Sequence, residues 1–243
     1  MTLHPAAADG FRRGAAAYER GRPGYPDVAV DHLVAALPGR RVIDLAAGTG
    51  KLTRLLVARG CEVTAVEPVA EMRVLIEPPA RAVGGVAEAI GLPDASADAV
   101  TVAQAFHWFD GPRALAEIHR VLRPRGVLAL LWNRRDLRDV LQRRLSALLE
   151  PHRGGVPAHR DDAWRAAIEA SALFGPLHEA TFAGEQVVDA AGLADRIGSI
   201  SFVAAMGDDE RTALLDEVRG LVAARERVTL RYVVELQLAR RLP

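Results

Sequence analysis

The first 135 residues alternate short apolar runs with segments in which apolar residues recur at helical spacing. Runs typical of buried strands lie at residues 42–45, 62–66, 81–84, 98–103 and 127–132. Helical repeats fill residues 27–37, 50–59, 69–77 and 112–122, with Asp27 expected to cap the first of these helices. Because the strand runs are continuously apolar, they predict a parallel sheet that helices cover on both faces. Right-handed crossovers then give a doubly wound, Rossmann-like α/β sheet.

The remainder of the chain is less regular. Helices are predicted at residues 136–150, 162–172, 189–197 and 208–224, and strands at 177–188 and 228–239. The segment 151–161 contains Gly154, Gly155 and Pro157, which is typical of a loop. A chain of 243 residues could form one large α/β domain or two small ones, and we expect a single domain over residues 1–243.

The first strand leads into a turn of small residues, from Ala46 to Gly50, that is followed by a helix. Small side chains let the backbone of such a turn come close to a ligand, and a helix N-terminus offers unpaired N–H groups. Asp44 lies in the strand before the turn, and Glu67 ends the next strand. The pattern therefore predicts a ligand site that carries both signs of charge.

Three known kinds of ligand-binding loop are candidates for this turn. A phosphate-binding P-loop requires Gly where Leu45 stands and Ser or Thr where Leu52 stands. A dinucleotide fingerprint requires a third Gly where Thr53 stands, and Asp44 would repel a pyrophosphate. S-adenosylmethionine carries an ammonium, a sulfonium and a carboxylate but no phosphate. Asp44 suits its cationic end, the turn amides suit its carboxylate, and Glu67 can accept hydrogen bonds from its ribose hydroxyls.

The turn Asp44–Gly50 resembles motif I of the class I S-adenosylmethionine-dependent methyltransferases, and Glu67 falls where that family has its ribose-binding acid. Ala46 departs from the family, which more often has Gly at this position. Further segments resemble a bacterial and fungal subgroup of small-molecule methyltransferases that includes enzymes similar to trans-aconitate methyltransferases. These segments are Tyr18–Pro26, Gly85–Glu88, Ala103–Asp110 and Glu117–Gly126.

The resemblance implies a seven-stranded sheet whose last strand is antiparallel. It implies a cofactor-binding core over residues 27–135, a substrate lid with the closing strands over 136–243, and a segment over 1–26 that covers the cofactor. It implies S-adenosylmethionine as cofactor, with S-adenosylhomocysteine as product. The residues expected to bind the cofactor are Tyr18, Arg22, Asp44, Ala46, Gly48, Thr49, Glu67, Ala87, Glu88 and Gln104.

The acceptor is expected to be a small molecule. His107 is the candidate base, because an imidazole can take a proton near neutral pH, and Trp108, Arg196 and Ser199 are further candidates for substrate binding. Structural alternatives stay open, since an aromatic cluster around His107 could simply pack a helix on the sheet. A protein that binds the cofactor without transferring methyl, and a nicotinamide enzyme, are the alternative functions.

Composition adds few constraints. Lys and Arg together number 31, as do Asp and Glu, so the net charge of zero predicts neither a nucleic-acid nor a membrane partner. The single Cys61 fits a reducing cytoplasm, and the high Arg and Ala content suggests a bacterial source. Without a Cys cluster or His-rich tract, no metal is expected.

Overall fold

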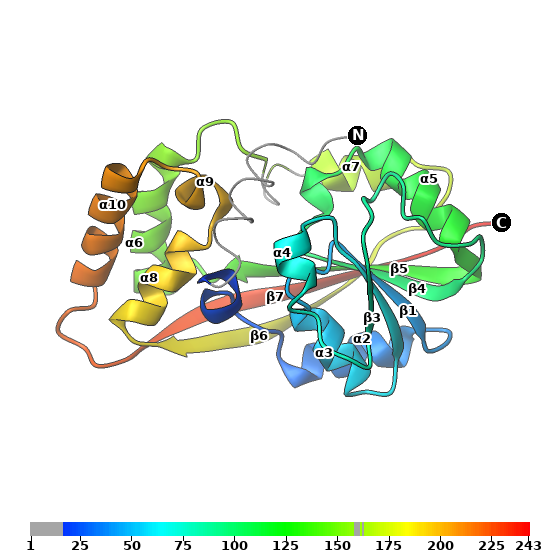
Figure 1. Ribbon diagram of the computed structural model, residues 1–243, viewed down its shortest axis with the longest axis horizontal. Helices are drawn as coiled ribbons and strands as arrows, with labels where there is room; N and C mark the ends of the chain where they lie inside the picture. The colour runs from blue at the N-terminus through cyan, green and yellow to red at the C-terminus, as the bar shows by residue number, and fades with distance from the viewer. Residues whose placement is uncertain (1–16, 158–160, 162) are drawn as a thin grey trace. The chain divides into compact units, whose positions relative to one another are not determined.

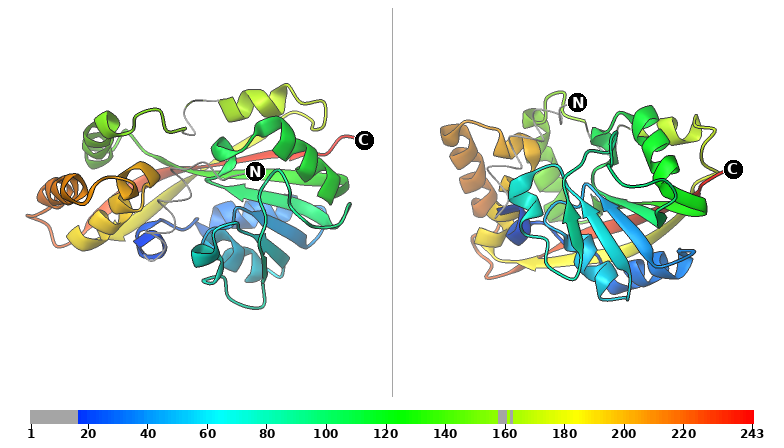
Figure 2. Two further views of the ribbon diagram at one scale, coloured as in Figure 1. Left: turned by 45° about the horizontal axis from the view of Figure 1, so that its top comes forward. Right: turned by 45° about the vertical axis from the view of Figure 1, so that its right-hand side comes forward.

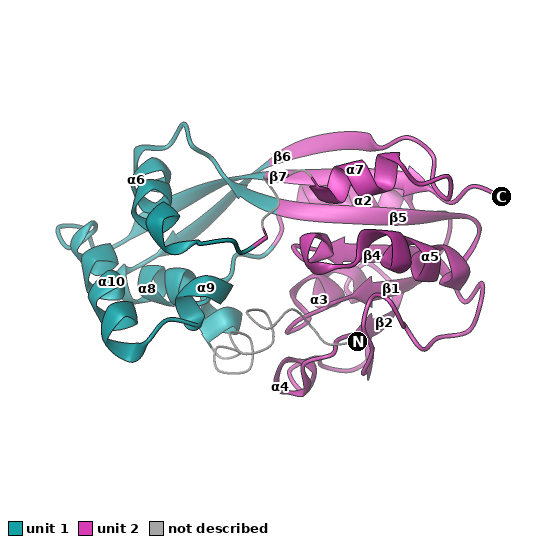
Figure 3. Ribbon diagram, turned by 90° about the horizontal axis from the view of Figure 1, so that it is seen from above, with its two compact units in different colours: residues 1–24, 133–156, 183–233 teal, residues 25–132, 157–182, 234–243 magenta. Residues whose placement is uncertain are grey.

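The computed structural model describes residues 17–157, 161 and 163–243. They form two compact units, of which unit 1 comprises residues 1–24, 133–156 and 183–233, and unit 2 residues 25–132, 157–182 and 234–243 (Figure 3). Residues 1–16 of the expected N-terminal segment, 158–160 of the expected loop and 162 of the expected helix lie outside the described residues. The expected single domain, with its core and lid segments, stays a prediction.

Within the described residues, seven strands form one sheet in the order β3-β2-β1-β4-β5-β7-β6. The strands are β1 (Arg41–Leu45), β2 (Glu62–Val66), β3 (Arg81–Val83), β4 (Ala97–Ala103), β5 (Leu122–Arg135), β6 (His178–Val188) and β7 (Val228–Arg240). The pairs β1–β2, β1–β4, β2–β3 and β4–β5 are parallel. β7 is the one antiparallel strand (Figure 1). The predicted Rossmann-like sheet with an antiparallel last strand is confirmed.

Unit 2 holds five α-helices and one short 3-10 helix among the described residues. They are α2 (Asp27–Ala36), α3 (Lys51–Val57), α4 (Ala70–Arg73), η1 (Phe106–Trp108), α5 (Gly111–Val121) and α7 (Ala163–Glu169). In unit 2, α2 and α3 lie on one face of the sheet and α5 and α7 on the other (Figures 1 and 2).

Two hydrophobic cores line the two faces of the sheet in unit 2. Successive strand residues point to opposite faces, so Ile43 and Leu45 join the core under α5 and α7, whereas Val42 joins the core over α2 and α3. β5 follows the same rule, with Leu128 in the first core and Ala129 in the second. Burial on both faces explains why these strands read as unbroken apolar runs.

Unit 1 has a core of its own. Its helices are α6 (Val140–Leu149), η2 (Glu150–His152), α8 (Ala190–Gly198), α9 (Ser201–Ala204) and α10 (Asp208–Gly220). Their apolar faces pack with the unit 1 parts of β6 and β7 in one cluster that includes Leu193, Leu214 and Tyr232. None of the helices described is long and apolar enough to cross a membrane.

Several elements differ from their predicted bounds; for example, α6 begins four residues later than predicted and α10 ends four residues earlier. The helix predicted at 69–77 is only α4, because the amides of Leu75 and Ile76 bond three residues back and the chain then enters Pro78 and Pro79. β5 begins at Leu122 instead of 127, since a bulge separates the pairs Ala97–Leu122 and Ala99–Val127. Residues 201–204, predicted as neither helix nor strand, form α9.

The prediction that Asp27 caps the first helix is wrong. Pro26 is the N-cap, and Asp27 is the first helical residue. Its carboxylate instead pairs with Arg59, whose Nη2 lies 2.7 Å away. The fixed φ of Pro26 suits the entry to a helix, so the start of α2 does not need a capping side chain.

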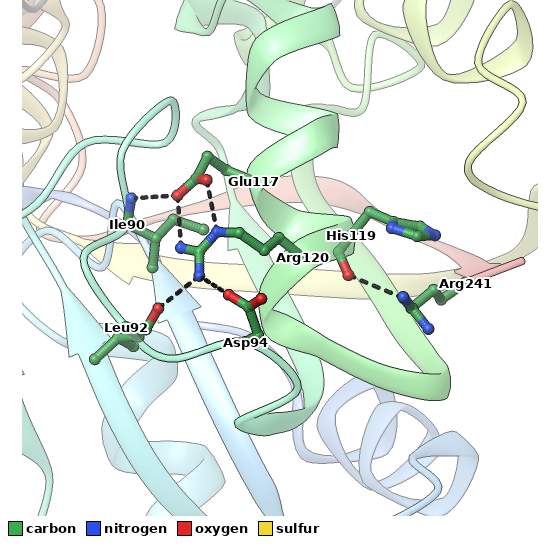
Figure 4. Close-up of polar contacts among 7 residues, drawn as sticks. All are labelled: Ile90, Leu92, Asp94, Glu117, His119, Arg120 and Arg241. Atoms are coloured by element: carbon green, nitrogen blue, oxygen red, sulfur yellow. Dashed lines mark hydrogen bonds and ion pairs between the residues drawn. The ribbon is translucent and has the colours of Figure 1, made fainter. Parts of the chain in front are cut away.

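Arg120 on α5 fastens the loop that connects β3 to β4 (Figure 4). Its guanidinium donates to the Leu92 carbonyl at 2.9 Å, the Asp94 carboxylate at 2.6 Å and the Glu117 carboxylate at 2.8 Å. Glu117 in turn accepts from the Ile90 amide at 3.0 Å, and its pKa lies below the usual range because Arg120 donates to it. The segment Glu117–Gly126 thus contributes structural contacts to unit 2.

Candidate functional site

The carboxyl ends of β1, β2 and β4 meet at one edge of the sheet in unit 2. Leu45 is in register with Val66 on one side and with Val102 on the other. The residues that follow these strands, Ala46 and Glu67 among them, therefore emerge side by side. The strand order also turns at this point, since β2 lies on one side of β1 and β4 on the other. Ligands of open α/β sheets bind at such a switch point.

The turn after β1 has an unusual backbone. Ala46, Gly48 and Gly50 have φ values of 55°, 60° and 81°, in the left-handed region. A side chain at Gly50 would also lie 3.2 Å from Ile76 Cγ1. Glycine adopts this conformation without strain, whereas alanine does so at a cost of roughly 1–2 kcal/mol. The turn is therefore held in a tight, specific shape, which is common at ligand sites.

Asp44 is buried beneath this turn, with 1% of its surface exposed. Its Oδ2 accepts a hydrogen bond from Thr53 Oγ1 at 2.6 Å, and its Oδ1 accepts one from Thr101 Oγ1 at 2.9 Å. Burial raises the pKa of Asp44 to about 6, although both hydroxyls favour the charged form. Asp44 thus links β1 to α3 and β4, and its role toward a cofactor stays a prediction.

Glu67 fastens the turn to the end of β2. Its Oε2 accepts from the Gly48 amide and its Oε1 from the Val69 amide, each at 2.8 Å. Burial raises the pKa of Glu67, and the nearby charge of Asp44 raises it further, while the two amides and Arg73 act against the shift. Each oxygen keeps a second lone pair with which it can accept a further hydrogen bond.

Two buried polar atoms at this edge have no hydrogen-bond partner among the described residues. They are Thr49 Oγ1 in the turn and Gln104 Nε2 after β4. Gln104 also has a φ of 61°, which is strained for a residue with a side chain. Buried polar groups are normally paired, so these two atoms are candidates for contact with a ligand, and the predicted cofactor roles of Thr49 and Gln104 stay predictions.

The segment after β3 is fixed by its own contacts. Ala87 is buried in the core on the α5 face of the sheet, and Glu88 Oε1 accepts from the Asp110 amide at 2.9 Å. Asp110 caps α5 by accepting from the Arg113 amide. Glu88 is thus an anchoring side chain, not only a solvated acid, and the predicted contact of this segment with the cofactor is untested.

His107 lies in η1, which follows β4, within a row of aromatic rings. Its ring centroid is 4.8 Å from that of Trp108 and 5.5 Å from that of Trp132, and Trp164 lies 5.2 Å beyond Trp132. These ring contacts are consistent with the alternative that the aromatic cluster around His107 serves packing. They also fix the orientation of the imidazole. The predicted roles of His107 and Trp108 toward an acceptor stay predictions.

The other predicted site residues belong to unit 1, where the structure brings them together. The Arg22 guanidinium lies 4.9 Å from the ring centroid of Tyr18 and donates to the Ser199 carbonyl at 2.8 Å. Ser199 Oγ donates to the Arg196 carbonyl at 2.8 Å. Arg196 Nε donates to the Tyr232 hydroxyl at 3.2 Å.

Sequence reasoning missed the partners of these residues. Thr53 and Thr101 carry no motif of their own, although the parallel register places Thr101 directly beside Asp44. Arg135, at the end of β5, lies in an Arg-Arg pair that looks like a solvated strand end. The local sequence offers no signal that Arg135 is set apart from a solvated strand end.

Comparison with known proteins agrees with this geometry. A family model described as a methyltransferase domain matches residues 43–130, which contain the turn, Glu67 and His107. An uncharacterized methyltransferase of Mycobacterium tuberculosis is 43% identical over 216 residues, which cover 88% of this chain and 85% of that protein.

Two further comparisons extend the match. A malonyl-[acyl-carrier protein] O-methyltransferase of Enterobacter lignolyticus is 36% identical over 152 residues, covering 57% of this chain and 61% of that protein. A solved structure from Anaeromyxobacter dehalogenans, provisionally assigned as a type II methyltransferase, has a TM-score of 0.63 at 27% identity and covers 90% of this chain and 96% of its own. With the strand-end turn and the acid after β2 in place, the chain belongs to the class I S-adenosylmethionine-dependent methyltransferases.

Proposed function

We propose that unit 2 binds S-adenosylmethionine at the turn Ala46–Gly50 and that the enzyme transfers its methyl group to a small-molecule acceptor. The observation that carries this proposal is the strained turn held by Glu67 at the switch point of the sheet. The buried, unpartnered Thr49 Oγ1 and Gln104 Nε2 fit a polar ligand at the same edge. When bound, this cofactor supplies a methyl group activated on a sulfonium.

The charges at this edge favour that cofactor over a phosphate-bearing one. Asp44 and Glu67 are both buried carboxylates, and the charge of Asp44 acts on Glu67. A pyrophosphate placed on the turn would face two like charges, whereas a cationic sulfonium or ammonium would be attracted. A nicotinamide dinucleotide is therefore the weaker alternative.

Each residue of the turn has a distinct task in this proposal. Glu67 accepts hydrogen bonds from the ribose hydroxyls through its remaining lone pairs, and Asp44 supplies negative charge near the cationic end. Ala46, Gly48 and Thr49 shape the turn so that its backbone approaches the cofactor. Further cofactor contacts within unit 2 are assigned to Ala87, Glu88 and Gln104.

His107 is the proposed base, because it would accept the proton that an attacking hydroxyl or amine loses. The neighbouring rings of Trp108 and Trp132 pack against the imidazole. Most of the acceleration is expected from orientation of the two reactants, since the sulfonium is already a good leaving group. The acceptor nucleophile is O, N or C, and the relatives favour none of these, because both an O-methyltransferase and a C-methyltransferase are among them.

The setting of the reaction is also part of the proposal. Cys61 is buried as a free thiol, which suits a protein of the reducing cytoplasm. The one alternative function kept is a protein that binds the cofactor without transferring methyl, because cofactor-binding residues alone do not establish transfer.

Calorimetry tests the cofactor assignment. S-adenosylhomocysteine should bind, and NAD should not. Glu67→Gln should weaken S-adenosylhomocysteine binding at least about tenfold, because a charge-assisted hydrogen bond is worth roughly 1.5–3 kcal/mol. Glu71→Gln, which removes an exposed acid from α4 in the same unit, is the matched control and should bind as the wild type does. Binding of NAD in preference to S-adenosylhomocysteine would overturn the assignment.

Turnover tests the base. Candidate metabolites are screened for release of S-adenosylhomocysteine, and His107→Ala is then compared with His178→Ala, an exposed histidine at the start of β6. We expect His107→Ala to bind cofactor normally and to transfer methyl about 10²–10⁴ times more slowly, the usual contribution of a general base. An unchanged rate rejects the role of His107. The absence of transfer to any acceptor, with tight cofactor binding, would favour the non-transferring alternative.

A further inference from the structure

Arg135 and Arg196 in unit 1 lack a carboxylate partner among the described residues. Arg196 on α8 is 7% exposed; its Nε donates to the Tyr232 hydroxyl, and its Nη1 is buried without a hydrogen-bond partner. Arg135, at the end of β5, is half-buried and makes one long contact, from Nη1 to Ser146 Oγ at 3.4 Å. Within the part of the chain that the structure describes, neither guanidinium forms an ion pair.

The acids next to these arginines in the chain pair with exposed arginines instead. Asp195, which precedes Arg196, accepts from Arg20 at 2.8 Å. Asp136, which follows Arg135, accepts from Arg138 at 2.8 Å. The buried positive charge of unit 1 is therefore not neutralised by the nearest available carboxylates.

Arg135 and Arg196 both lie beside the same part of β7: the amide that follows Arg135 donates to the Arg231 carbonyl at 3.0 Å, and Arg196 donates to the adjacent Tyr232. Their positive charges act on one another. Burial, together with the charges of Arg196 and Arg22, lowers the pKa of Arg135 to about 9, against the opposing effect of Tyr232. Arginine normally keeps its charge far above this range. Placing a guanidinium in such surroundings costs several kcal/mol unless a counter-charge is present. The fold tolerates this cost without supplying the counter-charge.

Neutral hydrogen-bonding groups complete the surroundings of Arg196. The Tyr232 hydroxyl, which accepts from Arg196, donates to Gln186 Oε1 at 3.3 Å. Gln186 Nε2 donates to the Gly21 carbonyl at 2.9 Å, so that side chain is fixed as well. Tyr232 is 3% exposed and belongs to the unit 1 core, which gives the cluster a rigid wall. These groups orient the guanidinium and leave its charge uncompensated.

We propose that Arg135 and Arg196 form an oxyanion-binding site in unit 1, which takes a carboxylate or phosphate group of a small ligand. A guanidinium offers a planar set of donors that matches both groups and binds them with charge-assisted hydrogen bonds. The Nη1 of Arg196, which has no hydrogen-bond partner among the described residues, would donate to that group.

Binding of simple anions to the whole protein tests this site. Citrate and inorganic phosphate are the probes, titrated by calorimetry at constant ionic strength with chloride as reference. We expect saturable binding of at least one probe, weakened at least about tenfold in Arg135→Gln and in Arg196→Gln. Arg135→Lys and Arg196→Lys, which keep the charge but lose the planar fork, should retain part of the affinity. Arg231→Gln, next to Tyr232 on β7 but exposed, is the control and should bind normally.

Thermal stability separates this role from a purely structural one. Arg135→Met and Arg196→Met remove a buried charge at similar volume, so their melting temperature without anion should equal or exceed that of the wild type. The anion-dependent rise in melting temperature should disappear in both. A lowered melting temperature with an undiminished anion-dependent rise, or no saturable binding of either probe to the wild type, would overturn the proposal. S-adenosylhomocysteine binding, measured in parallel, reports on the proposed function separately.

Discussion

Ala46 illustrates how one side chain can oppose the backbone conformation that its loop requires. Its φ of 55° lies in the left-handed region, where the methyl group crowds the backbone. The neighbouring Ala47 is not among the residues with positive φ. The family more often has Gly where Ala46 stands, and the structure explains that preference.

We therefore expect Ala46→Gly to raise the free energy of unfolding by about 0.5–1 kcal/mol. Glycine relieves the backbone strain at this position, and this gain exceeds the loss caused by the greater flexibility of the unfolded chain. Ala47→Gly is the matched control and should destabilise, because only the unfolded-chain effect applies there. Urea unfolding of the two variants measures the difference. A loss of stability in Ala46→Gly equal to that of the control would contradict the strain at this position.

Asp44 is the residue whose protonation the fold changes most clearly at the candidate site. Burial raises its pKa from 3.8 to about 6, so between these values the folded state binds more protons than the unfolded state. The contribution of Asp44 to stability is therefore fully present below about pH 4 and is lost as the pH rises through about 6.

Asp44→Asn removes this titration while an amide can still meet both threonine hydroxyls. Relative to the wild type, the variant should gain about 3 kcal/mol in unfolding free energy between pH 4 and pH 7, from about two pKa units at 1.36 kcal/mol each. Urea unfolding across this pH range measures the gain. A difference between variant and wild type that does not change with pH would show that Asp44 titrates normally.

At the scale of elements, the helical residues 17–21 dock closely onto α8 within unit 1. A Cβ atom at Gly21 would lie 2.5 Å from the backbone carbonyl of Asp195, so no side chain fits there. The docking also includes the ion pair of Arg20 with Asp195 and the hydrogen bond from Gln186 to Gly21. This contact holds Arg22 against Ser199.

Gly21→Ala should displace this segment and destabilise unit 1 by roughly 1–3 kcal/mol, the usual cost of overpacking. Gly24→Ala, where no atom lies within 4 Å of the added methyl, is the matched control and should leave stability almost unchanged. Hydrogen exchange at the Arg22 amide, which donates to the Tyr18 carbonyl, reports the displacement. Unchanged protection of that amide in Gly21→Ala would contradict the close docking.

At the scale of the whole molecule, two hydrophobic cores belong to unit 2 and a third to unit 1. The candidate cofactor turn lies entirely in unit 2, and the arginine pair lies in unit 1. A ligand of either site should therefore raise the local stability of the unit that binds it more than that of the other unit.

S-adenosylhomocysteine at 100 times its Kd should add about 2.7 kcal/mol to the free energy of opening of the unit that binds it. Hydrogen exchange read by mass spectrometry should show the slowing in residues 44–50 and 67–69 of unit 2. Glu67→Gln, if it binds tenfold more weakly, should reduce the gain to about 1.4 kcal/mol at the same ligand concentration. Slowing confined to unit 1 would contradict the assignment of the cofactor to the turn.

The sequence by itself determined the architecture of the Rossmann-like parallel part of the sheet. Continuous apolar runs are typical of a parallel sheet that is covered on both faces. The predicted bounds of β2 therefore agree with the structure, and those of β1, β3 and β4 agree within one residue. Irregular features escaped prediction: the bulge in β5 and the early end of α4 depend on neighbouring strands and on turns that local patterns do not encode. The motif indicated the cofactor turn because its small residues and acids are close in sequence.

Only the tertiary structure decided how those acids are used and which arginines are buried. Asp44 and Thr101 meet because two parallel strands, 57 residues apart in sequence, lie in one register. Arg135, Arg196 and Tyr232 come from β5, α8 and β7, and their local sequence does not predict that these three residues lie together. Burial and the interaction between charges arise from contacts between segments that are distant in sequence. Local sequence patterns give the spacing of residues along the chain, but they do not show which distant segments come into contact.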